Sequence, residues 1–225
     1  MKLTNTSGTS ILVEGVIFDM DGLIYDSERL FFQQKQIVTR EYGYTETEEN
    51  YVQTLGLTGE TLKSTMLSIY GKDYPFEEIS KKSRENMMKF ISQNGLPIKK
   101  GITQLLQFLK QNNIPCAIAS STHLTYIQEY LSKTNLNNYF SAVIGGDMIR
   151  HSKPEPDIFL EAAAALSLSP SQCLVLEDSE NGILAAHNAG IPVICIPDMK
   201  QPQDTFCSLT FDLLSDASRL PSMFS

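Results

Sequence analysis

The sequence predicts an α/β fold in which a doubly wound parallel sheet carries an inserted all-helical domain. Three observations support this fold class. Short apolar runs rich in Val and Ile recur along the chain, segments of helix length separate most of them, and one long stretch after the first run has helical patterns without an evident strand. Runs that are apolar on both faces are typical of parallel strands covered by helices.

The predicted strands are five short apolar runs and one weaker run. They span residues 13–18, 115–119, 142–144, 173–176 and 192–196, with the weaker run at 209–211. Helix-length segments lie at residues 101–111, 124–133, 157–166 and 182–188. This alternation predicts parallel strands joined by crossover helices. The residues before the first run predict only a short polar lead into that strand.

The stretch that interrupts this alternation predicts a separate helical domain. From about residue 28 to residue 93 helical patterns follow one another, and Gly43 and Gly71 mark helix ends. The segment NGLPIKKG at residues 94–101 has the Gly and Pro of a linker. We therefore expect an α/β core of residues 1–27 and 99–225, and a helical cap of residues 28–98. Inserts of this kind can move relative to the body and cover a site.

The composition excludes several classes of partner. The chain has 225 residues, 42% of them hydrophobic, and a formal net charge of −8, which argues against nucleic acid and anionic membrane surfaces. No apolar run approaches the roughly 20 residues of a membrane span, and the N-terminus lacks an apolar signal core. The four cysteines have no zinc-site spacing. We expect a reduced cytoplasmic protein that is monomeric.

Polar side chains of chemical interest follow four of the predicted strands. They are Asp19, Asp21, Ser120, Ser121, Lys153, Glu177 and Asp178. Ligands of open parallel sheets bind beyond the carboxyl ends of the strands, so we expect these side chains to converge on one edge. The two neighbouring aspartates repel each other, and a divalent cation together with the lysine would neutralise them.

Each of these groups has a simpler interpretation when taken alone. The Asp-Gly sequence ending at Gly22 fits an ordinary turn. Either Ser120 or Ser121 fits a helix N-cap, which does not exclude a phosphate there. Lys153 fits a solvated surface lysine, and the acidic pair at 177–178 fits the N-terminal end of a helix dipole. The functional interpretation depends on the joint pattern, because four coincidences at one sheet edge would be unexpected.

The motifs resemble those of the haloacid dehalogenase superfamily of phosphohydrolases. They are DMDG at residues 19–22, ASS at 119–121, KPEPDIF at 153–159 and EDSENG at 177–182. They span nearly the whole chain in the family order, and their combination is far more specific than the DxD pair. The helical insert resembles the cap of the β-phosphoglucomutase-like branch. The resemblance implies a Rossmann-like core and a small phosphorylated metabolite, usually a sugar phosphate, as substrate.

The resemblance also implies roles for the acidic residues. Asp19 would be the nucleophile that forms an aspartyl-phosphate. Asp21 would be the general acid that protonates the leaving group and then the base that acts on water. Mg²⁺ would bind the Asp19 carboxylate, the Asp21 backbone carbonyl and Asp178, with Glu177 in or near the shell.

The remaining site residues would bind the phosphoryl group. Ser120 would donate a hydrogen bond to a phosphoryl oxygen, helped by a backbone N–H near Ser121. Lys153 would offset the charge of the nucleophile and the phosphoryl group. Most of the rate enhancement would then come from positioning and charge neutralisation.

The cap separates a phosphatase from the alternative, a hexose phosphomutase. In the mutases a cap helix carries a histidine after the DxD motif, and a cap loop carries a lysine and an arginine. Here Phe31 takes the place of the histidine, and Leu55 and Gly59 take the places of the two cations. The clamp for a second phosphate is therefore missing, which favours a phosphatase. Leu55 and Gly59 are the expected cap contacts to the substrate. Further candidates for lining the cap are Phe31, Phe32, Leu57 and Thr58.

A function of another class is a phospho-accepting regulatory domain, which also uses an aspartate, Mg²⁺, a hydroxyl residue and a lysine on a parallel sheet. Asp21 opposes this function because a general base would hasten loss of the phosphoryl group. A helical cap is also superfluous for such a switch.

Overall fold

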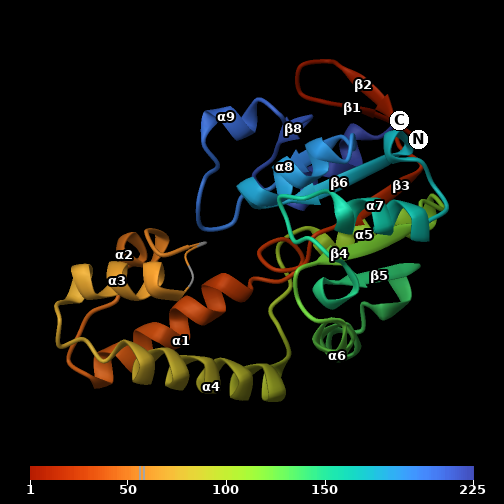
Figure 1. The fold of residues 1–225 in the computed structure, drawn as a ribbon. Coiled ribbons are helices and arrows are strands. Elements are labelled where there is room, and N and C mark those ends of the chain that lie inside the picture. The colour runs from red at the N-terminus through yellow and green to blue at the C-terminus, as the bar shows by residue number, and fades with distance from the viewer. Residues whose placement is uncertain (56, 58) are drawn as a thin grey trace. The chain divides into compact units, whose positions relative to one another are not determined.

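The computed structural model describes residues 1–55, 57 and 59–225, and it divides the chain into two compact units (Figure 1). An α/β unit contains Met1–Asp26 and Leu96–Ser225, and a helical unit contains Ser27–Gly95. The helical unit is an insertion between the first strand of the large sheet and the rest of that sheet. Among the helices within the described ranges, none is long and apolar enough to cross a membrane.

In the part of the chain that the structure describes, the α/β unit is built on a six-stranded sheet of order β5-β4-β3-β6-β7-β8. Its strands are β3 (Gly15–Phe18), β4 (Cys116–Ser120), β5 (Ala142–Gly145), β6 (Cys173–Glu177), β7 (Val193–Cys195) and β8 (Asp212–Leu213). All neighbouring pairs are parallel. This order confirms the predicted doubly wound sheet, and it puts β3 where the strand order reverses.

Helices join successive strands of this sheet, and all of them except α9 lie at the predicted positions. They are α5 (Ile102–Gln111), α6 (Leu124–Thr134), α7 (Asp157–Ala165), α8 (Glu180–Asn188) and the short α9 (Asp204–Cys207). The described part of this unit also contains four 3₁₀ helices: η1 (Asn137–Tyr139), η2 (Gly146–Met148), η3 (Pro170–Gln172) and η4 (Ala217–Met223).

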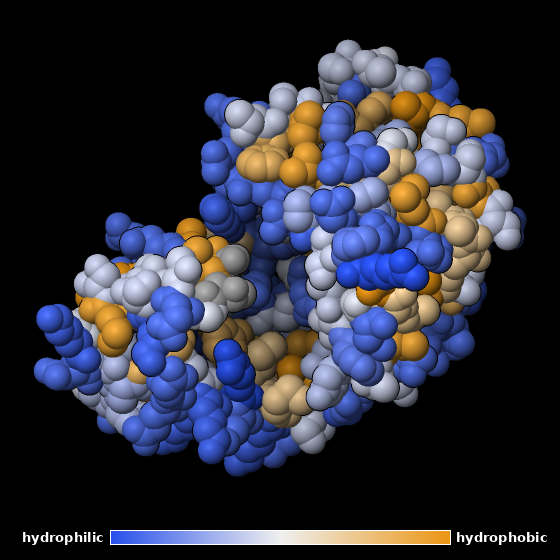
Figure 2. All heavy atoms as spheres, viewed as in Figure 1, coloured by the Kyte–Doolittle hydropathy of each residue, from blue (hydrophilic) through white to orange (hydrophobic). Residues whose placement is uncertain are grey.

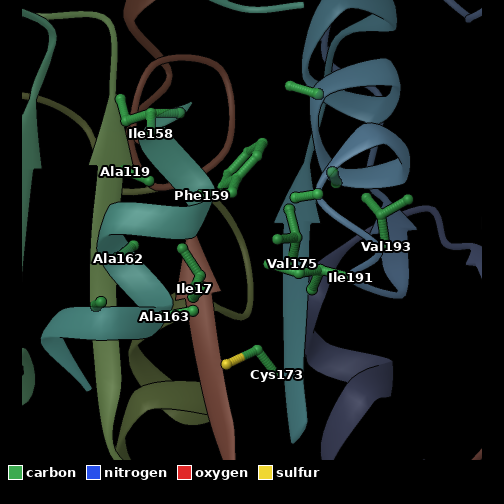
Figure 3. Packing of buried hydrophobic residues seen from close by; sticks show 14 of the residues in the cluster. Ile17, Ala119, Ile158, Phe159, Ala162, Ala163, Cys173, Val175, Ile191 and Val193 are labelled. Atoms are coloured by element: carbon green, nitrogen blue, oxygen red, sulfur yellow. The ribbon is translucent and has the colours of Figure 1, made fainter. Parts of the chain in front are cut away.

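Helix α7 packs on the sheet through a narrow apolar stripe. Its buried residues are Ile158, Phe159, Ala162 and Ala163, whose spacing places them on one face of the helix. Figure 3 shows this face against Ile17, with Phe159 projecting from α7 toward β6. Burying a side chain the size of Ile or Phe stabilises the fold by roughly 1.5–3 kcal/mol. On the face seen in Figure 2, hydrophilic residues predominate and hydrophobic residues form smaller patches.

The first residues of the chain form a hairpin, so the prediction of a polar lead is wrong. Strand β1 (Lys2–Thr4) pairs with β2 (Ser10–Leu12) in an antiparallel sheet. The polar residues between them make the turn, in which the Asn5 side-chain oxygen accepts hydrogen bonds from the Ser7 hydroxyl (2.9 Å) and the Thr9 N–H (2.8 Å). A polar segment without periodicity does not reveal such local bonds in advance.

Strand β8 begins at Asp212, after the apolar run at 209–211 that was predicted to form it. The Asp212 carboxylate accepts hydrogen bonds from the Thr6 N–H (2.8 Å) and the Thr6 hydroxyl (2.9 Å). An acidic residue in the strand is therefore satisfied by the N-terminal hairpin turn. The apolar pattern places the strand too early in the chain, because it carries no information about the hydrogen bonds between Thr6 and Asp212.

Two antiparallel linkers connect the α/β unit to the insertion. Within the α/β unit Tyr25 forms a β-bridge with Ile98. The Asp26 N–H donates to the Pro97 carbonyl (2.9 Å), and the Lys99 N–H donates to the Ile24 carbonyl (2.9 Å). The outgoing and returning chain segments are therefore held side by side where they leave the sheet.

The helical unit has its own small core. Its helices are α1 (Ser27–Glu41), α2 (Glu48–Val52), α3 (Gly59–Tyr70) and α4 (Phe76–Asn94). Val38, Met66, Tyr74 and Ile79 are buried together at its centre. The predicted helix ends are confirmed at Gly43 and Gly71, which follow α1 and α3 with φ of +81° and +96°. These backbone conformations favour glycine.

A buried ion pair fastens α1 to the segment before α2. The Lys35 Nζ lies 2.7 Å from a Glu46 carboxylate oxygen, with side chains 6% and 0% exposed. The other Glu46 oxygen accepts a hydrogen bond from the Tyr70 hydroxyl (2.9 Å), and Lys35 Nζ lies 5.2 Å from the centre of the Tyr51 ring. Burial lowers the pKa of Lys35, and Glu46 works against that effect.

We expect Lys35→Met to lower the free energy of unfolding of the helical unit by about 3–5 kcal/mol, because Glu46 would stay buried without its cation. Hydrogen exchange in α1–α4 of the full-length protein measures this loss. The matched control is Lys63→Met, which removes an exposed pair with Glu77 (3.1 Å) and should leave the stability nearly unchanged. Equal losses in the two variants would contradict the assignment of a stabilising buried pair.

Candidate active site

Three adjacent strands deliver the first site residues to one edge of the sheet. Asp19 follows the last residue of β3, and Ser120 and Glu177 are the last residues of β4 and β6, which flank β3. The Asp19 N–H still donates to the Leu176 carbonyl (3.0 Å), so the hydrogen-bond ladder of the sheet extends to Asp19. The predicted convergence at the carboxyl edge therefore holds for these three residues.

Lys153 joins two of these strand ends. Its Nζ donates hydrogen bonds to an Asp19 carboxylate oxygen (2.5 Å), to a Glu177 carboxylate oxygen (2.7 Å) and to the Ala119 carbonyl (3.3 Å). The ammonium also lies 4.8 Å from the centre of the Phe159 ring. The Lys153 side chain is 7% exposed, so its interpretation as a solvated surface lysine is wrong.

Burial and ion pairing act against each other in this group. Burial alone would lower the pKa of Lys153, but the carboxylates of Asp19 and Glu177 outweigh it and raise that pKa. Burial raises the pKa of Asp19, and Lys153 opposes this rise. The pKa of Glu177 is lowered, because the attraction of Lys153 and the hydrogen bonds to its carboxylate outweigh the effect of burial. Lys153 is therefore protonated and favours the ionised form of both acids.

The second aspartate of the motif is held by the neighbouring loop. Oδ2 of Asp21 accepts a hydrogen bond from the Thr122 hydroxyl (2.7 Å) and a longer one from the Ser120 hydroxyl (3.5 Å). Gly22 follows with φ of +83°, and a Cβ there would lie 2.2 Å from an Asp178 carboxylate oxygen. The turn interpretation of this motif is thus compatible with a site, since the glycine admits Asp178. Sequence reasoning missed Thr122.

A cluster of carboxylates lies at the same edge. Asp19, Glu177 and Asp178 each offer an oxygen, and these oxygens lie within 4.8 Å of one another. Desolvation and the charges of Glu177 and Asp19 raise the pKa of Asp178 well above its ordinary value. The cluster thus holds more negative charge than Lys153 offsets. Carboxylate oxygens with uncompensated charge fit a hard divalent cation such as Mg²⁺.

Both oxygens of Glu177 already accept hydrogen bonds. One accepts from Lys153, and the other accepts from the Asp178 N–H (2.7 Å), the Ser179 N–H (2.8 Å) and the Ser179 hydroxyl (2.9 Å). A Cβ at Gly182 would lie 1.7 Å from a Glu177 oxygen, so only glycine fits at that position of α8. Glu177 therefore orients Lys153 and the start of α8.

The helix-cap interpretation of the two serines is wrong. Helix α6 is capped by His123, whose Nδ1 accepts a hydrogen bond from the Thr125 N–H (3.4 Å). Ser120 is buried at the end of β4, and Ser121 follows it as an exposed residue. Both serines are therefore left at the sheet edge without a capping role.

The helical unit has a pocket of about 170 Å³ within itself. Phe31, Leu55 and Leu57, all predicted to line the cap, are among its lining residues. Two cations that sequence reasoning missed, Lys35 and Arg84, line it as well. The spacing offered a signal for one of them, since Lys35 lies four residues after Phe31 on α1 and therefore on the same face.

The other residues expected to line the cap have different outcomes. Phe32 is buried against Tyr51, with ring centres 5.0 Å apart, and it is not among the described residues that line the pocket. Gly59 begins α3 with φ of +55°. Thr58 lies outside the described residues.

A protein-family comparison matches residues 16–196 to the model of the haloacid dehalogenase-like hydrolases. The chain belongs to the haloacid dehalogenase-like hydrolases. Among relatives of this hydrolase, a Drosophila melanogaster protein named "Probable pseudouridine-5'-phosphatase" is 33% identical over 214 residues, 92% of each chain. A Thermotoga maritima "Phosphorylated carbohydrates phosphatase" is 34% identical over 180 residues, 80% of this chain and 82% of that protein.

Solved structures agree with this family. A haloacid dehalogenase-like protein of Agrobacterium tumefaciens is 26% identical with a TM-score of 0.77, covering 93% of this chain and 96% of that one. CbbY from Rhodobacter sphaeroides, in complex with phosphate, is 25% identical with a TM-score of 0.69 and the same coverage. The fold is the Rossmann-like core of the family with its helical cap. The protein is an enzyme, a hydrolase of phosphate esters.

We expect Asp178→Asn to raise the melting temperature of the metal-free hydrolase at neutral pH. The raised pKa of Asp178 means that its ionised form destabilises the folded state. This cost is absent below the unfolded-state pKa of about 3.9 and grows as the pH rises above it. The increase in melting temperature of the variant over the wild type should therefore be present at pH 7 and disappear toward pH 4. Added Mg²⁺ should stabilise the wild type more than the variant, as scanning fluorimetry would measure.

Asp216→Asn is a control for which the expected change in melting temperature at pH 7 has the opposite sign. Hydrogen bonds from Lys100 and Ser218 lower the pKa of Asp216 to about 2. Its stabilising effect is present above the unfolded-state pKa and is lost as the pH falls toward 2, so this variant should melt earlier at pH 7. A lower melting temperature for metal-free Asp178→Asn at pH 7, or an undiminished shift with Mg²⁺, would contradict the expected role of Asp178.

Proposed function

We propose that this hydrolase is a Mg²⁺-dependent phosphatase that transfers the phosphoryl group of a small metabolite first to Asp19 and then to water. One observation carries the proposal: the Lys153 ammonium bridges Asp19 and Glu177 beside Asp178 at the edge of the sheet. Such a group combines an oriented carboxylate with charges of both signs, as phosphoryl transfer requires.

In this proposal Asp19 is the nucleophile. Lys153 opposes the effect of burial and favours the ionised carboxylate, which is the form that attacks phosphorus. Ser120 and Lys153 hold phosphoryl oxygens, and a backbone N–H near Ser121 assists them. Asp21 then gives a proton to the leaving group and later takes one from the attacking water.

The proposed metal would be held by Asp19, Asp178 and the backbone carbonyl of Asp21. Glu177, whose oxygens are occupied by four donors, would stand behind these ligands and orient them. When bound, Mg²⁺ supplies positive charge that offsets the phosphoryl oxygens. The unbalanced charge of the acidic cluster supports such a cation, and so does the acidic balance of the whole chain.

The proposed substrate is a sugar phosphate or a similar small phosphorylated metabolite. The names of the Drosophila and Thermotoga relatives support this class. We propose that Leu55 and Gly59 of the cap contact the part of the substrate that leaves. An apolar loop of this kind selects by shape more than by charge.

A phosphomutase remains the alternative function, because two cations line the cap pocket. Lys35 is paired with the buried Glu46, so its charge is already offset. Arg84 alone would have to hold a second phosphate in that pocket. A single arginine is a weaker clamp than the pair expected of a mutase, which favours the phosphatase.

We further propose that the enzyme works as a monomer in the reducing cytoplasm. All four cysteines are free thiols, and three of them are buried. Burial raises the pKa of Cys116 to about 12 and of Cys173 to about 11, so these two stay protonated and unreactive.

We expect Asp19→Asn to lower turnover of p-nitrophenyl phosphate by at least about 10³-fold, because no attacking carboxylate remains. A colorimetric assay at saturating Mg²⁺ measures the loss, and circular dichroism checks the fold. Asp204→Asn, on the exposed surface of α9, is the control and should keep its activity. Undiminished turnover by Asp19→Asn would refute this nucleophile.

We expect β-glucose-1-phosphate, incubated with enzyme and a hexose bisphosphate primer, to release inorganic phosphate. Phosphorus NMR distinguishes free phosphate from an isomerised sugar phosphate in the same sample. Isomerisation without release would overturn the phosphatase and establish the mutase. A long-lived aspartyl-phosphate without turnover would instead support the phospho-accepting regulatory domain.

A further inference from the structure

The loop after β4 contains a hydroxyl with no role in the chemistry described so far. Thr122 donates a hydrogen bond to Oδ2 of Asp21 at 2.7 Å. We propose that Thr122 is a positioning residue for proton transfer, which fixes Oδ1 of Asp21 as the oxygen that protonates the leaving group. This inference rests on the proposed phosphatase function, and it concerns a residue between the family motif and α6.

The backbone of Thr122 is fastened on both sides. Its N–H donates to the Ser120 hydroxyl oxygen (3.1 Å), and its carbonyl accepts from the Gly146 N–H (3.0 Å). A Cβ at Gly146 would lie 2.2 Å from the Ser121 carbonyl oxygen, so a glycine is needed for this approach. The position of the Thr122 hydroxyl is therefore set by the loop and by the start of η2.

The next residues extend the same attachment. The Leu124 N–H donates to an Asp147 carboxylate oxygen at 2.8 Å, which ties the first turn of α6 to η2. This bond is the largest reason that the pKa of Asp147 lies below its ordinary value, so Asp147 is an ionised acceptor. Hydrogen bonds therefore hold the loop in place on both sides of Thr122.

Thr122 is the stronger of the two donors described for the Asp21 carboxylate. The Ser120 hydroxyl lies 3.5 Å away, at the limit of a hydrogen bond, and it is assigned to the phosphoryl group. In a protonated carboxyl group the oxygen without the proton is the better hydrogen-bond acceptor, so a hydroxyl that donates to one oxygen favours the proton on the other. While Thr122 donates to Oδ2, the acidic proton of Asp21 is therefore held on Oδ1.

The proton transfers then balance over both half-reactions. In the first, a bond forms between Asp19 and phosphorus, the bond from phosphorus to the leaving oxygen breaks, and that oxygen takes the proton of Asp21 Oδ1. In the second, water attacks phosphorus, Oδ1 accepts a proton from the water, and the bond to Asp19 breaks. Thr122 keeps its own proton and donates to Oδ2 throughout.

The test compares two leaving groups in the full-length enzyme with saturating Mg²⁺. An alkoxide from glycerol phosphate needs a proton as it leaves, whereas p-nitrophenolate stabilises its own charge. General acid catalysis contributes about 10²–10⁴-fold. We expect Thr122→Val to lower kcat/KM about 10–100-fold for glycerol phosphate and by less than about threefold for p-nitrophenyl phosphate.

The controls separate positioning from folding. Thr122→Ser keeps the hydroxyl and should recover most of the loss on glycerol phosphate. Asp21→Asn should show the same preference for the aryl ester, and adding Thr122→Val to it should cause little further selective loss, since both act on one proton.

Two outcomes would overturn the inference. Equal losses on both esters, with a lower urea midpoint, would make Thr122 merely structural, and unchanged kinetics on glycerol phosphate would remove its role. The activity of the wild type on the two esters tests the proposed phosphatase function separately. If it hydrolysed neither ester, the proposed phosphatase would fail, and the inference would fail with it.

Discussion

The bridge of Lys153 between Asp19 and Glu177 is the interaction on which the rest of the site depends. Three charged side chains are removed from water at the ends of adjacent strands. Buried charges are costly unless they are paired and hydrogen-bonded, and here each has a partner within 2.7 Å. The same lysine lies over Phe159, whose ring belongs to the core beneath it. Core packing and site geometry are therefore coupled through one ammonium group.

The two units use buried lysines in different ways. In the helical unit Lys35 forms an ion pair with Glu46, and the charges of that pair cancel. In the α/β unit one lysine faces two carboxylates, with Asp178 nearby, so negative charge remains. A compensated pair stabilises structure, whereas an uncompensated group is suited to receive a cation or a phosphoryl group. This difference in net charge explains why the group around Lys153, and not the Lys35–Glu46 pair, has the character of an active site.

Most of the fold and the centre of the site could be predicted because they follow from short-range patterns. Apolar runs and helix-length spacers locate the parallel strands, and the strand ends locate Asp19, Ser120 and Glu177. What escaped prediction depends on long-range polar contacts. Asp212 lies in a strand because the turn after β1 satisfies it, and Thr122 reaches Asp21 because residues of η2 hold its loop. Periodicity carries no information about such partners.

The paired linkers at Tyr25 and Ile98 have a consequence for the diversity of this family. The chain leaves the sheet and returns to it through neighbouring positions of one short ladder. A segment inserted between such close ends changes neither the register nor the order of the strands. The helical unit can accordingly be exchanged or resized during evolution while the sheet and the residues at its edge are kept.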